Sequence, residues 1–278
     1  GFVYNGNTLT PQDGSFKGDA VVDVAAGQSG GKGAPANGGG GGNNHNNGGG
    51  GGANLSTGGD GGGNSSSVGC RVSNPARGGK ALSNHGGTKI FLGGGGGAGH
   101  SNFNFPNPSG GGHGGGIVFI EAENLIGNSH KIVANGSRGG NSLGDGASGS
   151  GAGGTLILDI DNYIGTTTFE ANGAQGGTAN DGGNVGRCYG AGGGGSGGAI
   201  RLVAESITGT GNLTAIGPGS PANAVLTLES ATSAGGNGRI RIETVRNQLG
   251  GLTTLPGASV VPLSGEPQLW PAPSAPSV

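Results

Sequence analysis

The chain has 278 residues, of which 75 are glycine, 10% are charged and 4% are aromatic, and its formal net charge is −2. Thirteen basic residues against fifteen acidic ones provide no basic stripe for binding nucleic acid. The sequence contains no apolar run of about eighteen residues, which argues against a membrane-spanning helix. The low charge also differs from that of a disordered polypeptide, which stays open through charged and polar residues.

The first part of the chain, residues 1–115, contains few strand-like stretches. Two of them are "GDAVVDVAAG" at 18–27 and "GGTKIFLGG" at 86–94, and the tract "GGNNHNNGGGGG" lies between them. We expect a glycine- and asparagine-rich half with sparse strands here. Because the chain starts at Gly1 and contains no methionine, we interpret it as the mature form of an exported protein, secreted or displayed at the cell surface.

A small aromatic cluster lies near the end of this half. His100 and His113 flank the stretch "SNFNFPNPSGGG", which contains Phe103 and Phe105. One interpretation is an exposed contact surface at a loop tip that touches a sugar or a protein. The other is that the two phenylalanines fill a corner of the fold and that histidine is simply tolerated in such loops.

Residues 116–261 contain four similar segments, which define a strand-repeat half. The segments begin at Gly116, Gly154, Gly198 and Gly238, about 40 residues apart. Each has an alternating apolar–polar strand, and in the first three a glycine and a second short strand follow clearly. Alignment places their apolar residues in matched rows: Val118, Leu156, Ile200 and Ile240 in one, and Ile120, Leu158, Leu202 and Ile242 in the next.

A strand of this kind buries one face, and a single repeat cannot cover that face alone. The repeats must therefore stack, with matched apolar residues forming ladders from strand to strand. We predict an all-β fold, a repetitive β-solenoid or stacked β-sheet architecture, with essentially no helix.

Long glycine-rich excursions separate the strand pairs. One is "GSRGGNSLGDGASGSGAGG" at 136–154, and another fills 173–198. Structureless loops of this length are uncommon in compact domains. Three alternatives stay open: linkers, wide irregular loops, or extended segments of polyglycine-II type with three residues per turn, packed through close backbone contacts.

The two cysteines, Cys70 and Cys188, are far apart and match no zinc or haem motif. They form either one long-range disulfide in an oxidising compartment or two unpaired thiols. The C-terminal residues 262–278, "PLSGEPQLWPAPSAPSV", are rich in proline and contain Trp270. Since proline cannot sit in a central strand, we predict an extended arm available for assembly.

No motif in the chain points clearly to catalysis, a metal or a cofactor. G-x-S-x-G occurs by chance in a chain this rich in glycine and serine, without the strand–helix context of a nucleophile elbow. Paired acids at Glu121 and Glu123, and at Asp159 and Asp161, share a strand face and resemble a polysaccharide-cleaving pair. Their repetition argues against catalysis, because a polar strand face predicts such residues in every repeat, so we expect no enzyme.

The stretch "GGGGSGGAIRLVAESITGTGNLTAIG" at 192–217, with "GSGAGGTLILDIDNYIG" and "HGGGIVFIEAENLIG", resembles the repeats of large glycine-rich bacterial surface and secreted proteins. The excursions are loosely similar to those of phage tail-fibre tip adhesins and springtail antifreeze proteins, although the regular glycine triplets of the latter are absent. The resemblance implies architecture, and no catalytic residue accompanies it.

Two functions are expected. The first is a non-enzymatic extracellular structural protein, a subunit of a filament, fibre or sheath that self-associates head to tail into a homopolymer. The alternative is an adhesin whose glycine-rich loops bind a receptor or glycan. A polysaccharide-degrading β-helix enzyme is a remote third possibility.

Overall fold

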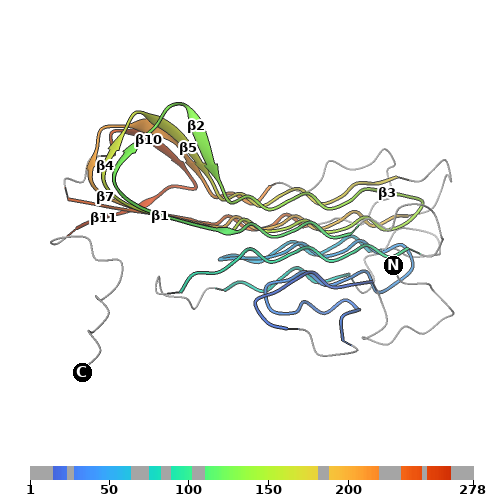
Figure 1. The fold of residues 1–278 in the computed structure, drawn as a ribbon. Helices are drawn as coiled ribbons and strands as arrows, with labels where there is room; N and C mark the ends of the chain where they lie inside the picture. Colours follow the sequence, from blue (N-terminus) through green and yellow to red (C-terminus); the bar gives the residue numbers. More distant parts are fainter. Residues whose placement is uncertain are drawn as a thin grey trace, which may run out of the picture.

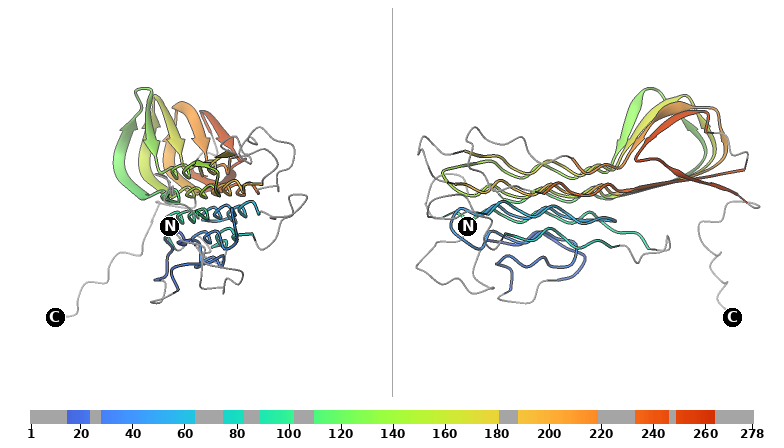
Figure 2. Two further views of the ribbon diagram at one scale, coloured as in Figure 1. Left: turned by 90° about the vertical axis from the view of Figure 1, so that its right-hand side faces the viewer. Right: turned by 180° about the vertical axis from the view of Figure 1, so that it is seen from behind.

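The computed structural model describes residues 15–23, 28–63, 75–82, 89–101, 110–180, 188–218, 233–245 and 249–263. Most of the strands gather at one end of an elongated molecule, and extended glycine-rich segments run side by side over the rest of its length (Figure 1). Seen end-on, these segments form layered rows next to the strands (Figure 2). The molecule thus has two regions, which we call the sheet region and the glycine array.

The sheet region consists of a five-stranded sheet with the order β1-β4-β7-β9-β11 and a four-stranded sheet with the order β10-β8-β5-β2, in which all neighbours are parallel. The strands are β1 (Ile117–Ile126), β2 (His130–Val133), β4 (Thr155–Ile164), β5 (Thr166–Glu170), β7 (Ala199–Ile207), β8 (Thr210–Thr214), β9 (Arg239–Thr244), β10 (Gly251–Leu255) and β11 (Ser259–Pro262). A third sheet, β3 (Ser142–Leu143) with β6 (Ala179–Asn180), lies far from them (Figure 1).

The predicted apolar ladders are confirmed by the strand register. Leu158 pairs with Ile120 on one side and Leu202 on the other, and Leu202 pairs in turn with Ile242. These side chains meet residues of the four-stranded sheet, such as Phe169, in one core between the two sheets. Repeat alignment therefore gave the correct register because the strand period of two leaves one buried face per strand.

The predicted β-solenoid or stacked β-sheet architecture is wrong. The strands form three separate open sheets, none of which closes or coils as a solenoid. After β2 the chain does not turn straight into the next strand, but runs out and back through the glycine array over residues 134–154. The absence of helix in the described parts of the chain agrees with an all-β class.

The glycine array is built from extended segments that hydrogen-bond to one another with a period of three residues. They are residues 15–19, 29–33, 37–42, 48–53, 58–62, 76–80, 93–98, 110–116, 134–140, 146–154, 171–178, 190–198, 215–217 and 233–238. A three-residue period is that of an extended polyproline-II-like helix, whose backbone groups point outward in three directions. In these segments the chain is therefore neither a linker nor an irregular loop.

Residues 146–154 show how completely the array satisfies its backbone. Successive N–H groups donate in turn to 190–196, 134–140 and 94–97, and the intervening carbonyls accept from 49–52, 174–177 and 112–115. The segment thus has six neighbours, three as acceptors and three as donors. A buried peptide group that has no hydrogen-bond partner costs free energy. Because this pattern pairs the N–H and C=O groups in all directions around the segment, the backbone can be buried under several neighbours without forming a sheet.

Glycine is required by the close approach of these backbones. A Cβ atom built on Gly149 would lie 2.0 Å from the carbonyl oxygen of Gly50, and one on Gly151 would lie 1.8 Å from that of His113. Side chains are accepted only where they fit between segments, as do the fully buried Ala152 and Ser150. The array is consequently held by backbone hydrogen bonds and dense packing, with little apolar side-chain area.

Candidate functional site

The first repeat forms an open edge of the sheet region. β1 ends the five-stranded sheet and β2 ends the four-stranded sheet, so both outermost strands lie on the same side. Their core-facing residues are only partly buried: Val118, Ile120, Leu125 and Ile132. In the next repeat the corresponding Leu156, Leu158, Tyr163 and Phe169 are fully buried. One side of the core is therefore left uncovered by the described chain.

The same edge also carries exposed apolar side chains on its outer surface. They are Ile117, Phe119, Ile126 and Val133, of which Ile126 is 71% exposed. Apolar groups on both faces of a ten-residue edge strand are unusual, because edge strands are normally protected by charge, proline or short length. We call β1, β2 and these side chains the open edge.

At the opposite side, β10 and β11 end the two sheets and are only five and four residues long. Val260 of β11 continues the ladder of Ile242, and Leu252 of β10 is buried in the same core. β11 terminates at Pro262, which has no N–H to offer a further strand. The two ends of the sheet region are thus different surfaces.

The outer face of the five-stranded sheet carries a charged cluster. The Oε1 atom of Glu243 accepts hydrogen bonds from Nε of Arg201 at 2.6 Å and from Nε of Arg241 at 2.9 Å. Burial acts to raise the pKa of Glu243, but the hydrogen bonds and charges of the two arginines together hold it below its ordinary value.

Glu121 and Asp159 are register partners on adjacent strands of this face. Burial raises the pKa of Asp159, the neighbouring carboxylate of Glu121 adds to that rise, and Arg201 opposes it. Two of the four acids named for the polysaccharide-cleaving alternative, one from each pair, are thus side by side. Asp159 adjoins the Arg201–Glu243 pairing, an arrangement that also occurs in purely structural ion-pair networks.

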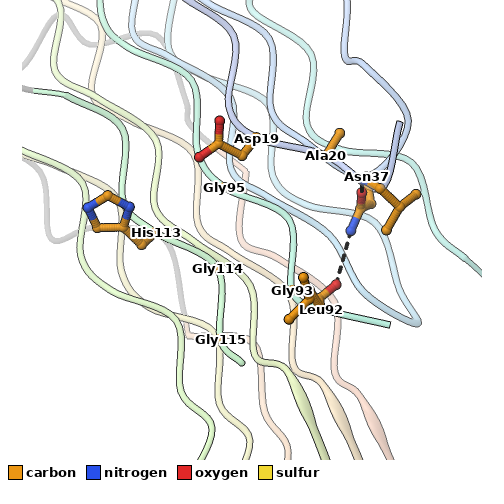
Figure 3. Close-up of a pocket in the computed structure, with 10 residues that line it drawn as sticks. Asp19, Ala20, Asn37, Leu92, Gly93, Gly95, His113, Gly114 and Gly115 are labelled. Carbon is orange, nitrogen blue, oxygen red and sulfur yellow. Dashed lines mark hydrogen bonds between the residues drawn. The ribbon is translucent and has the colours of Figure 1, made fainter. Parts of the chain in front are cut away.

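The glycine array contains a groove of about 210 Å³. It is lined by Asp19, Ala20, Val21, Asn37, Leu92, Gly93, Gly95, His113, Gly114 and Gly115. His113 lies on one side of it and Asn37 with Leu92 on the other (Figure 3). The buried Asn37 amide is fully used, since Nδ2 donates to the carbonyls of Ala53 and Leu92 at 3.2 Å and Oδ1 accepts from Val21 N–H. The groove floor is glycine backbone.

The residues of the predicted contact surface are only partly within the described chain. His100 is fully buried, and its Nδ1 accepts a hydrogen bond from the N–H of Asn46 at 3.0 Å, so its assignment to an exposed surface is wrong. Burial, and secondarily the nearby His45, lowers the pKa of His100 to about 4. His113 is exposed and lines the groove. Phe103 and Phe105 lie outside the described residues.

The remaining predicted residues are only partly within the described chain. Cys188 is disulfide-bonded. Its predicted partner Cys70 lies outside the described residues, and so does Trp270 of the proposed assembly arm.

Among the residues that the structure describes, no group of three histidine, cysteine or acidic side chains is placed to hold a metal ion. Within the same residues, no helix has the length and apolar character needed to cross a membrane. Sequence reasoning missed the groove, since Asp19, Leu92 and His113 come from distant segments that carry no common motif.

Comparison with known proteins places the chain in no family: no protein-family model matches it, and neither a curated protein nor a solved structure is significantly similar to it.

Proposed function

We propose that this protein is an extracellular structural subunit that self-associates head to tail through its open edge. The observation that carries the proposal is the uncovered core at β1 and β2, where Val118, Ile120 and Ile132 are only partly buried. Covering this core removes apolar area from water, which is the main driving force for association.

The parallel strand order gives the association a direction. Since every strand in both sheets is parallel to its neighbours, a second copy added in the same orientation continues both sheets and their ladders. Such a contact joins the open edge of one copy to the β10–β11 side of the next. A heterologous contact of this type repeats without limit unless its rotation closes a ring, so it produces a fibre.

The extracellular assignment is supported by the disulfide at Cys188. Disulfides form and persist in oxidising compartments and are rare in the cytosol. A non-enzymatic role accords with the ion pairs of Glu243, which engage Arg201 and Arg241 in contacts within the protein.

The test is sedimentation velocity and negative-stain microscopy over a range of protein concentrations. The wild-type chain is expected to form concentration-dependent linear oligomers. Ile132→Lys places a charge at the uncovered core and is expected to weaken association at least tenfold. The matched control is Leu143→Lys in β3, also on an exposed apolar residue but far from the sheets.

Circular dichroism of both variants separates loss of association from loss of folding. Monodisperse wild-type monomers at all concentrations contradict the proposal. So does equal weakening by the two lysine variants, because that result removes the open edge as the contact.

A further inference from the structure

The groove occupies a place in the glycine array that no described segment fills. Residues 93–98 illustrate this, because their N–H groups donate in turn to 110–116, 48–53 and 15–19. Their carbonyls accept from only two further segments, 146–154 at Gly94 and Gly97, and 37–42 at Gly95 and Ala98. This segment therefore has five described neighbours, whereas residues 146–154 have six.

Two carbonyls of residues 93–98 show where a sixth neighbour would bind. Gly93 and Gly96, three residues apart, accept no hydrogen bond within the described chain. In the complete pattern around residues 146–154, donors and acceptors alternate from neighbour to neighbour. The same alternation around residues 93–98 assigns the carbonyls of Gly93 and Gly96 to a segment lying between 15–19 and 110–116, which is where the groove lies.

The two walls supply the complementary groups. Gly111 and Gly114, again three residues apart, donate to no acceptor in the described chain, although the N–H groups of Gly112 and His113 between them are both bonded. The N–H of Asp19 on the other wall is also without an acceptor there. Gly93, Gly114 and Asp19 line the groove, and Gly96 and Gly111 lie three residues further along the same two segments. Together they offer two carbonyls and three N–H groups that have no partner in the described chain.

The space around residues 92–96 is also open on the side of the groove. Leu92 and Gly95, three residues apart, both line the groove, and Leu92 is 54% exposed. A Cβ atom on Gly95 would approach its nearest atom, the nitrogen of Asp19, to 3.0 Å, whereas on neighbouring Gly94 and Gly96 it would approach carbonyl oxygens to 1.9 and 2.2 Å. Crowding is thus relieved on the side that faces the groove.

We propose that this groove binds one extended, glycine-rich strand of a partner polypeptide, which completes the array by donating N–H groups to Gly93 and Gly96 and accepting from Gly111 and Gly114. Recognition uses backbone hydrogen bonds, as when a peptide adds to a sheet edge, but with a period of three in place of two. Glycine is selected because a Cβ atom on the ligand's inward positions meets the same close backbones as in the array. The proposal is independent of self-association through the open edge.

The probe is a fluorescent peptide of three Gly-Gly-Ser triplets with a lysine at each end for solubility, titrated with the full chain by fluorescence anisotropy. Saturable one-to-one binding is expected. A matched peptide in which every glycine is N-methylated keeps the extended shape but loses most donors, and is expected to bind at least tenfold more weakly. Equal binding of the two peptides, or no binding of the first, overturns the proposal.

Two variants locate the site. Val21→Trp and His113→Trp each place a bulky ring in the groove and are expected to weaken peptide binding at least tenfold. Val22→Trp is the matched control, because Val22 is also exposed but does not line the groove. Unchanged binding in both groove variants overturns the proposal.

Self-association of the same variants is measured alongside. If Val21→Trp abolishes oligomers while the peptide fails to bind, the occupant is a second copy of this chain, and the partner proposal is wrong. If Ile132→Lys abolishes oligomers while the peptide still binds, the groove and the open edge are separate surfaces, as proposed.

Discussion

The sheet region and the glycine array fill and stabilise a buried interior in different ways. In the sheet region, large apolar residues such as Leu158 and Phe169 fill the space between two sheets, and backbone bonding occurs in the plane of each sheet. In the array, residues 146–154 bond in six directions and leave no room for more than an alanine or serine. Stability comes from apolar burial in the first region and from backbone packing in the second.

The two regions are also continuous in the chain. The N–H of Gly154 donates to the carbonyl of Ala134, and the next residue, Thr155, begins β4. Each repeat therefore passes from one mode of packing to the other at a single residue. The comparison implies that substitutions of opposite kind damage the two regions: loss of side-chain volume in the sheets and gain of volume in the array.

The largest effect is expected from Phe169→Ala in the sheet region. Phe169 is fully buried and packs edge-to-face on Tyr163, with ring centroids 5.7 Å apart. Its removal leaves a cavity between the sheets and is expected to lower the free energy of unfolding by about 3–5 kcal/mol. Urea denaturation measures the change. Phe119→Ala, at a residue that is 43% exposed, is the control and is expected to cost under about 1 kcal/mol.

A slightly smaller loss is expected when volume is added to the array. Gly149→Ala brings a methyl group to 2.0 Å from the Gly50 oxygen, and both partners are backbone, so the segments must separate. We expect a loss of about 3 kcal/mol, at the upper end for overpacking. Gly116→Ala is the control, since nothing lies within 4 Å of its Cβ position.

Hydrogen exchange shows where this second loss falls. Amide protection should drop around residues 94–97 and 49–52 before it drops in β4 and β7. Simultaneous loss of amide protection in both regions would mean that the array and the sheets unfold as one cooperative unit. The two regions would then differ in how they pack but not in when they unfold.

The smallest effect concerns pH and acts on the array alone. His100 has a pKa of about 4 in the folded chain, against 6.5 for the unperturbed side chain. The unfolded chain therefore binds more protons in this interval, and stability falls as pH decreases from about 6.5 to about 4. We expect a contribution of about 2–3 kcal/mol across the interval.

Urea denaturation at a series of pH values tests this expectation. His100→Gln should remove most of the slope between pH 6.5 and 4.5, whatever its effect on stability at neutral pH. His113→Gln, at an exposed histidine, should keep it. Below pH 4.5 the ion-paired Glu170 and Glu243 add their own loss, because their pKa values are lowered in the folded chain.

Much of the sheet region was predictable from the sequence. Aligned repeats matched Leu156 with Ile200 and Leu158 with Leu202, and the structure pairs the same residues. Such a prediction succeeds because the apolar side chains of a strand mark its buried face, and matching these faces between repeats fixes the register. The sequence did not predict that the sheets stay open, since the alternation of apolar and polar residues is the same in a closed coil and an open sheet.

The array was far less predictable. Which segment lies beside which, for example 146–154 beside 94–97, leaves no trace in residues that lack side chains. His100 illustrates the difficulty: in the sequence it sits among asparagine and glycine like a surface residue, but it is buried by segments from elsewhere in the chain. The groove was invisible for the same reason, because its chemistry consists of backbone groups at Gly93 and Gly114.

The three-residue period of the array has a consequence for insertions and deletions. Removing one residue from 146–154 turns every following N–H toward the wrong neighbour, whereas removing three restores the bonding directions and only shortens the segment. In β4 the corresponding unit is two residues. Length differences among homologues of this chain should therefore occur in steps of three residues along the array and of two residues along the sheets. Lengths should vary freely only in the turns between segments.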